Sequence, residues 1–464
     1  MTDRMEGFID HELIYQILEQ TKNVDDEAIE RVLNKTFDKQ TLSYDDVAIL
    51  LQAKKPEHIN RIYQRASQIK NEIYGNRVVM FAPLYVSDYC INSCTYCGYK
   101  RDNKFARRKL TKAELQEEVR ILEKMGHKRI ALEAGEDPVN CDINYIVETI
   151  KTIYETVSDK SNIRRINVNI ASTTVENYKK LKDADIGTYI LFQETYNKTT
   201  YETLHPNCPK GDYLYHLTAF DRAMQAGIDD VGAGVLFGFS DHRFEVLALM
   251  MHNAHLEKTY GVGFHTISVP RLKKAEGVSL ENYDHIIDDE TFKKVVAILR
   301  LAVPYTGIIL STRESEATRN ELIHHGVSQL SSGSCTGVGG YAESLLGNHV
   351  PQFTIADDRT TLEVIKGLVK DGFIPSFCTS CYRMGRTGDR FMKLAKTGEI
   401  QHVCQPNALM TLKEYALDFG DEALNQMTDS FIEAQVEKIK SEETKKIVIK
   451  GISDLTNGKR DIFL

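Results

Sequence analysis

Apolar positions in the first part of the chain follow a helical period. Up to about residue 75 they recur every three or four positions with charged residues between them, as at Ile29, Val32 and Leu33, which is the spacing of amphipathic helices. The pattern predicts helices at 25–34, 44–52 and 58–73. No group of catalytic residue types gathers there. We therefore expect residues 1–75 to form a helical N-terminal extension packed against the main domain.

From residue 78 the pattern changes to short β-rich runs that alternate with amphipathic helical runs, which is typical of parallel βα units. Eight candidate strands lie at 78–86, 129–134, 165–171, 188–193, 230–237, 263–269, 307–311 and 329–332. Between the first two, Thr111 and Glu114 predict a capping box, and Leu115, Val119 and Leu122 form one apolar stripe. Eight such units predict an α/β fold, a (βα)8 TIM-type barrel over residues 76–340. An open doubly wound sheet is the alternative, although no GxGxxG follows the first strand.

The alternation stops after Gly340. Residues 361–369 have a helical pattern, 378–404 form a compact basic segment that contains cysteines, and the tail from Leu412 is again helical and charged. We expect a separate C-terminal module over residues 341–464, and we find no internal repeats.

Composition and charge exclude several classes of protein. Of the 464 residues, 42% are hydrophobic, which is enough for a sizeable core. The net charge of -8 comes from 58 basic and 66 acidic residues in a mixed order, which argues against nucleic-acid or anionic-membrane partners. The first residues lack a signal-peptide pattern, and no stretch approaches the roughly 18 apolar residues of a membrane span. We expect a cytoplasmic protein.

Nine cysteines change this picture, because structural disulfides are rare in the cytoplasm. Three of them, Cys141, Cys208 and Cys335, are scattered and are explained as small buried hydrophobes. The other six fall into two trios, Cys90, Cys94 and Cys97, and Cys378, Cys381 and Cys404.

The first trio directly follows the first predicted strand, on the loop at the C-terminal mouth of the barrel, where barrel enzymes carry their chemistry. Structural zinc prefers four ligands, and no fourth Cys or His lies nearby in the sequence. A [4Fe–4S] cluster held by three thiolates leaves one iron open for another ligand. We therefore favour an iron–sulfur cluster and keep a zinc site as the alternative.

The Cys-x3-Cys-x2-Cys spacing, with Tyr96 before the last cysteine, resembles the radical S-adenosylmethionine (SAM) superfamily. The resemblance implies that SAM binds the open iron and is cleaved to methionine and a 5′-deoxyadenosyl radical. Ala134, Gly135 and Glu136 are similar to the Gly-Gly-Glu motif of this family, which reaches the SAM amino group. Gly234 lies in a segment similar to the one that approaches the adenine. Close packing inside the barrel is the alternative explanation of that glycine.

The second trio has the spacing Cys-x2-Cys-x22-Cys and again offers three thiolates without a nearby fourth. Arg383, Arg386 and Arg390 would offset the negative charge of a thiolate-bound cluster. Two clusters with open positions indicate that one generates a radical and the other receives or holds a product.

The whole chain resembles the tyrosine lyases that mature [FeFe]-hydrogenase, which are relatives of the tyrosine lyase of thiamine biosynthesis. The motifs shared with both are YCGY at 96–99, QETY at 193–196, SVPR at 268–271 and LSTR at 310–313. By this resemblance we expect Gln193, Glu194 and Arg271 to contact the cofactor. The thiamine branch lacks the second trio, which therefore decides between the branches.

The resemblance also implies the chemistry. The adenosyl radical takes a hydrogen from the amino group of L-tyrosine, and the Cα–Cβ bond breaks to give p-cresol and dehydroglycine. Dehydroglycine breaks down to CO and cyanide, which join cysteine on a dangling fifth iron of the second, auxiliary cluster. The product is an Fe(CO)(CN)–cysteine synthon for the H-cluster of the hydrogenase, and other hydrogenase maturation proteins are the expected partners. His265, in the sixth predicted strand, is similar to the ligand of the dangling iron. A core histidine is the alternative.

An amino-acid substrate needs a bidentate cation for its carboxylate, and arginine is suited to this task. Arg313 stands just past the seventh predicted strand, and Ser331 and Ser332 stand on the eighth. An ion pair of Arg313 with Glu314 or Glu316 is the alternative. Two other functions stay open: a tyrosine lyase of thiamine biosynthesis, and a non-catalytic iron–sulfur scaffold that would need only the second trio.

Overall fold

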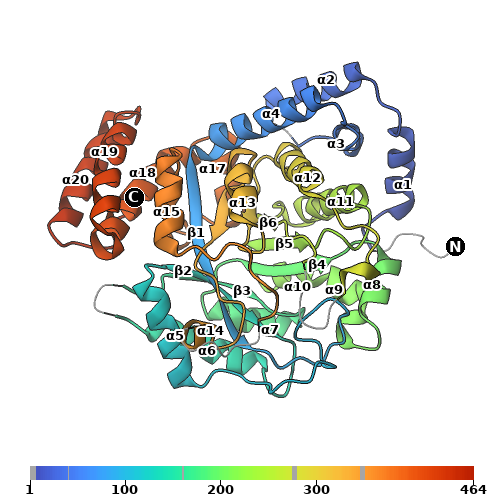
Figure 1. Cartoon of the computed structure of the whole chain (residues 1–464), viewed down its shortest axis with the longest axis horizontal. Helices are drawn as coiled ribbons and strands as arrows, with labels where there is room; N and C mark the ends of the chain where they lie inside the picture. The colour runs from blue at the N-terminus through green and yellow to red at the C-terminus, as the bar shows by residue number, and fades with distance from the viewer. Residues whose placement is uncertain (1–6, 40, 159–160, 274–278, 345–350) are drawn as a thin grey trace.

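The computed structural model describes residues 7–39, 41–158, 161–273, 279–344 and 351–464. Eight parallel strands form a closed barrel with helices packed around it (Figure 1). Strand β1 pairs with β2 on one side and with β8 on the other, which closes the barrel. The strands are β1 (Arg77–Ser87), β2 (Arg129–Ala134), β3 (Arg165–Asn169), β4 (Tyr189–Glu194), β5 (Val231–Val235), β6 (Thr266–Ser268), β7 (Gly307–Leu310) and β8 (Gln329–Ser331). The predicted (βα)8 barrel is confirmed, and the open doubly wound sheet is excluded.

Several strands are shorter than predicted, which moves two candidate residues. His265 lies immediately before β6 and not inside it. Its backbone N–H still donates to the carbonyl of Val231, and its backbone carbonyl accepts from the N–H of Gly307, both at 2.9 Å. His265 therefore stands at the lower, N-terminal rim of the barrel. Ser332 likewise follows β8, whereas Ser331 is the last residue of that strand.

The helices around the barrel follow the predicted pattern. In α5 (Lys112–Lys124) the capping box is present, since Thr111 accepts from the N–H of Glu114 and the Glu114 carboxylate accepts from the N–H of Thr111. The apolar stripe of this helix is buried. The other helices of the barrel are α6 (Ile143–Glu155), α7 (Val175–Asp183), α8 (Lys198–Leu204), α9 (Tyr213–Leu217), α10 (Ala219–Gln225), α11 (His242–Tyr260), α12 (Asp289–Ala302), α13 (Glu316–His324) and α14 (Gly340–Ser344). No helix within the described ranges is both long and apolar enough to cross a membrane.

Four helices form the N-terminal extension: α1 (His11–Gln20), α2 (Asp26–Lys35), α3 (Tyr44–Leu51) and α4 (Pro56–Tyr74). Helices α1 and α3 contact α11, and α4 packs against α12 (Figure 1). Helix α1 was not predicted, because it buries only Ile14 and Ile17 and so has a narrow apolar stripe. The first six residues, on which the search for a signal peptide partly rests, lie outside the described residues.

After the barrel, a ninth strand joins the sheet. Strand β9 (Ile374–Ser376) follows α15 (Thr361–Lys370) and pairs in parallel with the first residues of β1, Arg77 opposite Ile374. It was not predicted, because a strand of three residues is too short to show an alternation of apolar and polar positions. Phe377 and Cys378 follow directly, so β9 fixes the start of the second trio below the barrel.

The remaining helices are α16 (Ser380–Arg383), α17 (Gly388–Thr397), α18 (Ile400–Phe419), α19 (Glu422–Val436) and α20 (Glu442–Thr456). The prediction that the tail from Leu412 is helical is confirmed, but its first helix, α18, begins earlier, at Ile400, and continues through Pro406. Proline removes one helical hydrogen bond, but burial of Cys404, Asn407 and Ala408 on this helix holds it against the barrel.

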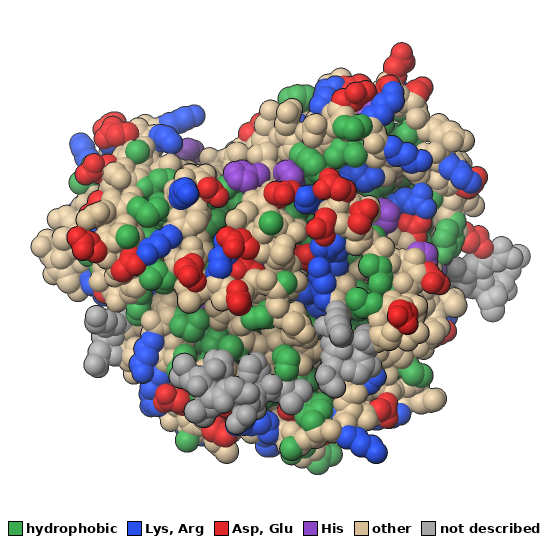
Figure 2. All heavy atoms as spheres, in the orientation of Figure 1, with side chains coloured by type: hydrophobic (Ala, Val, Ile, Leu, Met, Phe, Trp, Pro, Cys, Tyr) green, Lys and Arg blue, Asp and Glu red, His purple; other side chains and the backbone are tan. Residues whose placement is uncertain are grey.

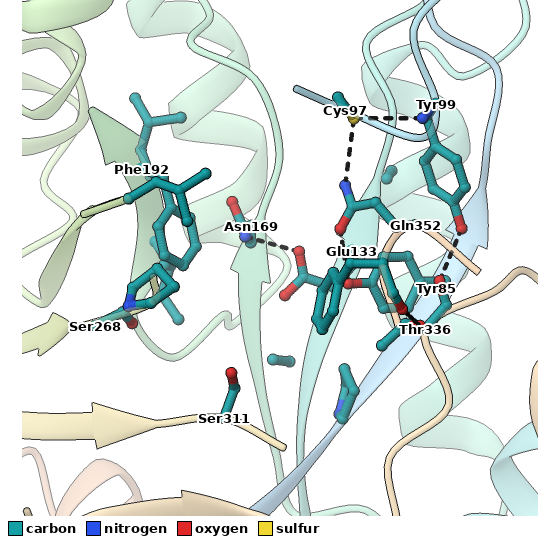
Figure 3. Close-up of a pocket in the computed structure, with 18 of the residues that line it drawn as sticks. Tyr85, Cys97, Tyr99, Glu133, Asn169, Phe192, Ser268, Ser311, Thr336 and Gln352 are labelled. Atoms are coloured by element: carbon teal, nitrogen blue, oxygen red, sulfur yellow. Dashed lines mark hydrogen bonds between the residues drawn. The ribbon is translucent and has the colours of Figure 1, made fainter. Parts of the chain in front are cut away.

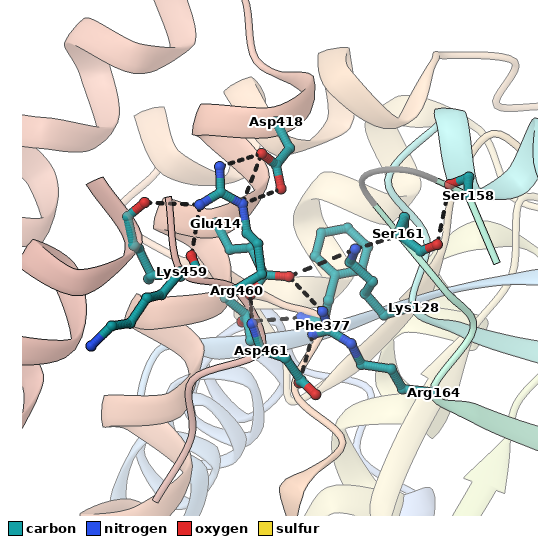
Figure 4. A network of polar contacts seen from close by, with 12 residues as sticks. Lys128, Ser158, Ser161, Arg164, Phe377, Glu414, Asp418, Lys459, Arg460 and Asp461 are labelled. Carbon is teal, nitrogen blue, oxygen red and sulfur yellow. Dashed lines mark hydrogen bonds and ion pairs between the residues drawn. The ribbon is translucent and has the colours of Figure 1, made fainter. Parts of the chain in front are cut away.

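A buried polar network ties the C-terminal helices to the lower face of the barrel (Figure 4). Glu414 of α18 pairs with Arg164 at 2.7 Å and with Lys128 at 3.6 Å. Arg164 also pairs with Asp461 at 3.1 Å. Because removing one member of such a network leaves a buried charge without its partner, we expect the network to fix the position of α18 and of its Cys404. On the outside, acidic and basic side chains are intermixed on the face in Figure 2, as the sequence indicated.

Candidate functional site

A cavity of about 250 Å³ lies at the C-terminal ends of the barrel strands (Figure 3). Cys90, Cys94 and Cys97 line it from the loop after β1, as predicted. Other predicted residues that line the cavity are Tyr96, Ala134, Gly135, Glu136, Glu194, Arg313 and Ser331. The structure therefore brings the first trio together with most of the predicted cofactor and substrate residues. Gln193, Gly234, Arg271 and Ser332 do not line it.

The cysteine loop is held against the end of β2. Asn92 donates from its amide to the carboxylate of Glu136 and accepts from the N–H of Lys210 at 3.0 Å. A Cβ atom on Gly135 would lie 2.4 Å from the carbonyl oxygen of Tyr89. Glycine is therefore required here for the loop and the strand to approach each other. Asn92 and Lys210 were not singled out in the sequence, because their role depends on this approach.

The thiols of the first trio suit a metal cluster. Burial raises the pKa of Cys97 to about 11 and also raises the pKa of Cys90, so that without a bound metal these groups stay neutral. Within the described ranges, no three His, Cys, Asp or Glu side chains converge on one ion. In a cubane cluster each thiolate binds a different iron, so such convergence is not needed. The donor set therefore fits a [4Fe–4S] cluster with three protein ligands.

A fourth cysteine lies beside this trio, contrary to the sequence analysis. Cys208 interacts with the side chain of Cys94, and this hydrogen bond lowers the pKa of Cys208 to about 5. The two residues are far apart in the sequence, and only the loop after β4 brings them together.

The wall of the cavity near Tyr96 is polar and tightly held. The Tyr96 hydroxyl hydrogen-bonds Nε2 of His205 at 2.8 Å. Glu194 adopts a left-handed backbone conformation, with φ at 67°, next to a bulge in β4, and its carboxylate pairs with Nζ of Lys210 at 2.7 Å. A strained non-glycine residue of this kind persists only where its surroundings hold it, and such residues cluster at active sites.

Arg313 is a partly buried cation without an ion-pair partner among the described residues. Its guanidinium lies 3.6 Å from the centre of the Phe353 ring, and its Nε has no hydrogen-bond partner. Glu314 and Glu316, the alternative partners considered above, pair with other arginines. Burial lowers the pKa of Arg313, although arginine stays protonated. An uncompensated guanidinium on a cavity wall is suited to an anionic ligand.

Two of the predicted residues outside the cavity wall support its shape. Arg271 forms a buried ion pair with Glu314 and donates to the carbonyl of Ile287, which connects the loops after β6 and β7. A Cβ atom on Gly234 would lie 2.3 Å from the ring of Phe192, which does line the cavity. Gly234 therefore makes room for Phe192.

The other two candidates outside the wall point elsewhere. The amide nitrogen of Gln193 is buried without a hydrogen-bond partner, while Phe192 and Glu194 on either side line the cavity. The hydroxyl of Ser332 donates to that of Thr361 at 3.4 Å.

A second, smaller cavity of about 40 Å³ lies at the opposite, N-terminal end of the barrel. Cys378, Cys381 and Cys404 line it together with His265. The structure therefore places the second trio and the candidate histidine at one site, although more than 100 positions of the sequence separate His265 from the nearest of these cysteines.

Arginines surround this second cavity. Arg386 lines it, as predicted for the cations of this segment. Arg383 instead pairs with Asp461 at 2.6 Å, and Arg390 is exposed. Two further arginines that line the cavity, Arg77 and Arg129, stand at the starts of β1 and β2 and were not predicted.

The arginines of the second cavity interact with the cysteines. Arg129 donates to the carbonyl of Cys378 at 2.9 Å. Burial lowers the pKa of Arg77, but the negative charge of the nearby cysteines more than offsets this, so that the pKa is raised overall. A hydrogen bond with Cys404, together with Arg386, lowers the pKa of Cys381. The same hydrogen bond raises the pKa of Cys404. Within this pair, the cavity therefore favours the thiolate, the form that binds metal, at Cys381.

His265 is held between aromatic and acidic neighbours. Its ring centre lies 4.6 Å from that of Phe391, and its Nδ1 lies 3.5 Å from the carboxylate of Asp230. Asp230 accepts from the N–H of Gly388 at 3.0 Å, which connects the start of β5 to α17. With Nδ1 near a carboxylate, Nε2 is the ring nitrogen left to bind a metal in the cavity that His265 lines.

Comparison with known proteins agrees with this arrangement. Residues 84–251 match the Radical SAM superfamily model, and residues 268–374 match the Biotin and Thiamin Synthesis associated domain. The 2-iminoacetate synthase of Salmonella typhimurium is 30% identical over 348 residues, which cover 75% of this chain and 89% of that protein.

Two solved structures are similar over almost the whole chain. The crystal structure of HydG, a maturase of the [FeFe]-hydrogenase, has 52% sequence identity and a TM-score of 0.96, with 98% of this chain and 100% of that chain covered. The FeFe-hydrogenase maturase HydG from Carboxydothermus hydrogenoformans has 38% identity and a TM-score of 0.83, with 95% and 98% covered. The match to the Radical SAM superfamily supports a [4Fe–4S] cluster and SAM as cofactors, and these relatives support tyrosine as a substrate. The chain belongs to the HydG family of radical SAM tyrosine lyases.

Proposed function

We propose that this enzyme cleaves L-tyrosine to p-cresol and dehydroglycine, converts dehydroglycine to CO and cyanide, and delivers both to an iron bound at a second cluster. With cysteine as a further ligand, the product is an Fe(CO)(CN)–cysteine synthon for the H-cluster of [FeFe]-hydrogenase. The observation that carries the proposal is the second cavity, where three cysteines and His265 meet at the far end of the barrel. A tyrosine lyase that ends at dehydroglycine has no use for such a site.

In this proposal the residues of the mouth cavity bind and orient the substrates. Cys90, Cys94 and Cys97 hold the first cluster. Arg313 takes the tyrosine carboxylate, because it is a partly buried guanidinium without an ion-pair partner among the described residues, and Ser331 lines the same cavity. Ala134, Gly135 and Glu136 form the wall toward SAM. When bound, the cluster supplies the electron for reductive cleavage of SAM.

The residues of the second cavity hold the metal-containing product. Cys378, Cys381 and Cys404 bind the auxiliary cluster, and His265 binds the iron that is carried to the hydrogenase. Arg77, Arg129 and Arg386 offset the negative charge of thiolates and of cyanide. Because small diatomic products must travel from one end of the barrel to the other, the two cavities act in sequence.

The similarity to the HydG structures supports this branch, since they match 98% and 95% of the chain, whereas the 2-iminoacetate synthase matches 75%. The similarity to 2-iminoacetate synthase nevertheless favours a second candidate function, a tyrosine lyase of thiamine biosynthesis that stops at dehydroglycine. Incubation of the reconstituted protein with SAM, tyrosine, cysteine and a reductant separates the two. We expect p-cresol together with CO and iron-bound cyanide; p-cresol without CO would support the thiamine branch. A non-catalytic scaffold would produce neither.

A further inference from the structure

A carboxyl group that the sequence analysis did not assign faces the mouth cavity. Glu133 lies on β2, and its neighbour in the register of β3 is Asn169, the last residue of that strand. The Asn169 amide donates to Oε2 of Glu133 at 2.7 Å (Figure 3). Both residues line the cavity. No other side chain within the described ranges donates to this carboxylate.

The other polar groups around Glu133 are already engaged or carry the opposite charge. The Tyr85 hydroxyl donates to Gln352 at 2.9 Å, and the Tyr99 hydroxyl donates to the carbonyl of Thr336 at 3.1 Å. Across the cavity, Lys210 and Glu194 pair with each other. Arg313 acts on Glu133 through its charge, although the two form no ion pair.

Lys210 and Glu194 pair with each other, and Glu136 accepts from Asn92 of the cysteine loop. The cavity then still offers one cation, Arg313, and one further carboxyl group, Glu133, which form no ion pair with each other. A free amino acid carries the complementary pair, a carboxylate and an ammonium group on the same carbon. With the carboxylate at Arg313, the amino group needs an acceptor on the same cavity wall. Burial raises the pKa of Glu133 to about 8, which is close to the range in which an amino group also exchanges its proton.

We propose that Glu133, oriented by Asn169, binds the amino group of tyrosine and accepts one of its protons. The inference rests on the proposed function in one respect: the product dehydroglycine has a C=N bond, which requires a nitrogen lone pair. In the step, the ammonium group and the Glu133 carboxylate become a neutral amine and a carboxylic acid. One N–H bond breaks, one O–H bond forms, and no electron is transferred. Glu133 is therefore a catalytic residue and Asn169 a positioning residue.

The number of protons released when tyrosine binds provides a test that does not require catalysis. At pH 7, below the pKa of Glu133, the free enzyme holds the carboxyl proton and free tyrosine holds its ammonium proton. The complex retains only one of these two, so binding should release close to one proton. At pH 9 the carboxyl group is already ionised, and the release should fall. Calorimetry in buffers of different ionisation enthalpy, on the holoenzyme with SAM and without reductant, measures this release.

The control ligand is 4-hydroxyphenylpropanoate, which is tyrosine without its amino group. It should bind the wild-type enzyme without proton release. In Glu133→Gln, which keeps the shape and the contact with Asn169, tyrosine affinity should fall at least tenfold while the affinity for the control ligand stays the same. Formation of p-cresol should fall by about 10²- to 10⁴-fold, the range for a positioned acid–base group. Glu117→Gln on the outer face of α5 should change none of these quantities.

Three outcomes would overturn the inference. One is a wild-type enzyme that releases no proton with tyrosine at pH 7, a result that does not depend on how any variant folds. Another is an equal loss of affinity for tyrosine and for the control ligand in Glu133→Gln. The third is weaker SAM binding in that variant with unchanged tyrosine affinity, which would assign the carboxylate to SAM. If wild-type enzyme makes p-cresol and CO while any of these results holds, only this inference fails and the proposed function stands. Glu133→Asp, which keeps a carboxylate, should retain the proton release.

Discussion

The two ends of the barrel each gather three cysteines, but they surround them differently. At the mouth, the cavity of about 250 Å³ has both a guanidinium, Arg313, and a carboxyl group, Glu133. At the lower end, the cavity of about 40 Å³ has three arginines and a histidine. A large cavity with both charges suits a zwitterionic organic substrate. A small cationic cavity suits a thiolate-bound cluster and the anions that collect on it. Two sets of three thiols are therefore suited to different ligands because of the residues around them.

We expect the largest loss of activity when the three cysteines at the mouth of the barrel are replaced. Replacing Cys90, Cys94 and Cys97 together by Ala should abolish formation of both deoxyadenosine and p-cresol, since no cluster remains to supply an electron. Chromatographic detection of the two products checks this. The second cluster should still assemble, which iron analysis can show. Continued SAM cleavage in the folded variant would contradict our assignment of the first cluster.

Loss of the lower thiols should have a narrower effect. Replacing Cys378 and Cys381 by Ala should leave p-cresol formation largely intact, because tyrosine is bound at the opposite end of the barrel, but should suppress CO and the synthon. Cys141→Ala, which removes a cysteine outside both trios, is the matched control. Parallel assays of p-cresol and CO measure the difference. If p-cresol disappears as well in correctly folded protein, the two ends do not divide the work as we propose.

A single substitution at the mouth should weaken substrate binding by a smaller factor. In Arg313→Lys the ammonium cannot reproduce the two-pronged contact with a carboxylate. We expect a loss of about 2–5 kcal/mol in tyrosine binding, or about 30- to 5,000-fold in affinity. Equilibrium binding to the holoenzyme measures it, with Arg120→Lys on the outside of α5 as control. Unchanged affinity would exclude Arg313 as the carboxylate ligand.

The smallest change concerns one iron. His265→Ala should retain both clusters and p-cresol formation but lose the fifth iron and the synthon, because the lower cavity would then lack its imidazole. Iron quantification and electron paramagnetic resonance of the reconstituted variant check this, with His324→Ala on α13 as control. An undiminished signal of the fifth iron would require another ligand.

The sequence predicted the mouth better than the lower end. The first trio lies on one loop after a strand, so spacing alone indicated both its place and its chemistry. The lower site combines residues from the starts of β1 and β2 with a cysteine segment fixed by β9. Arg77 and Arg129 look like ordinary strand-edge residues in the sequence, and a strand of three residues has no detectable period. Their role becomes visible only in the folded structure, because closure of the barrel brings these arginines next to the cysteines.

At the mouth, the residues that the sequence analysis did not identify have roles that arise only where two loops come into contact. Lys210 and Asn92 hold the cysteine loop only because the segment after β4 folds over it. Arg271 was assigned to the cofactor by resemblance, whereas in the structure it forms a buried ion pair with Glu314. Glu133 immediately precedes the Ala134–Glu136 motif, and nothing in the sequence distinguished it from its neighbours. Side-chain direction on a short strand decides its role, and this needs the register of β2 with β3.

One strand serves both ends of the barrel. The last residues of β1 lead into the cysteine loop at the mouth, and its first residues pair with β9. Arg77 and its partner Ile374 are about 300 positions apart in the chain, and contacts between such distant segments form late, because a long loop must close first. All three cysteines of the first trio lie on the loop that follows β1, although the segment after β4 holds that loop in place. The lower trio also needs β9 and α18, which come after the whole barrel in the sequence. During synthesis the thiols of the mouth are therefore available long before those of the lower end.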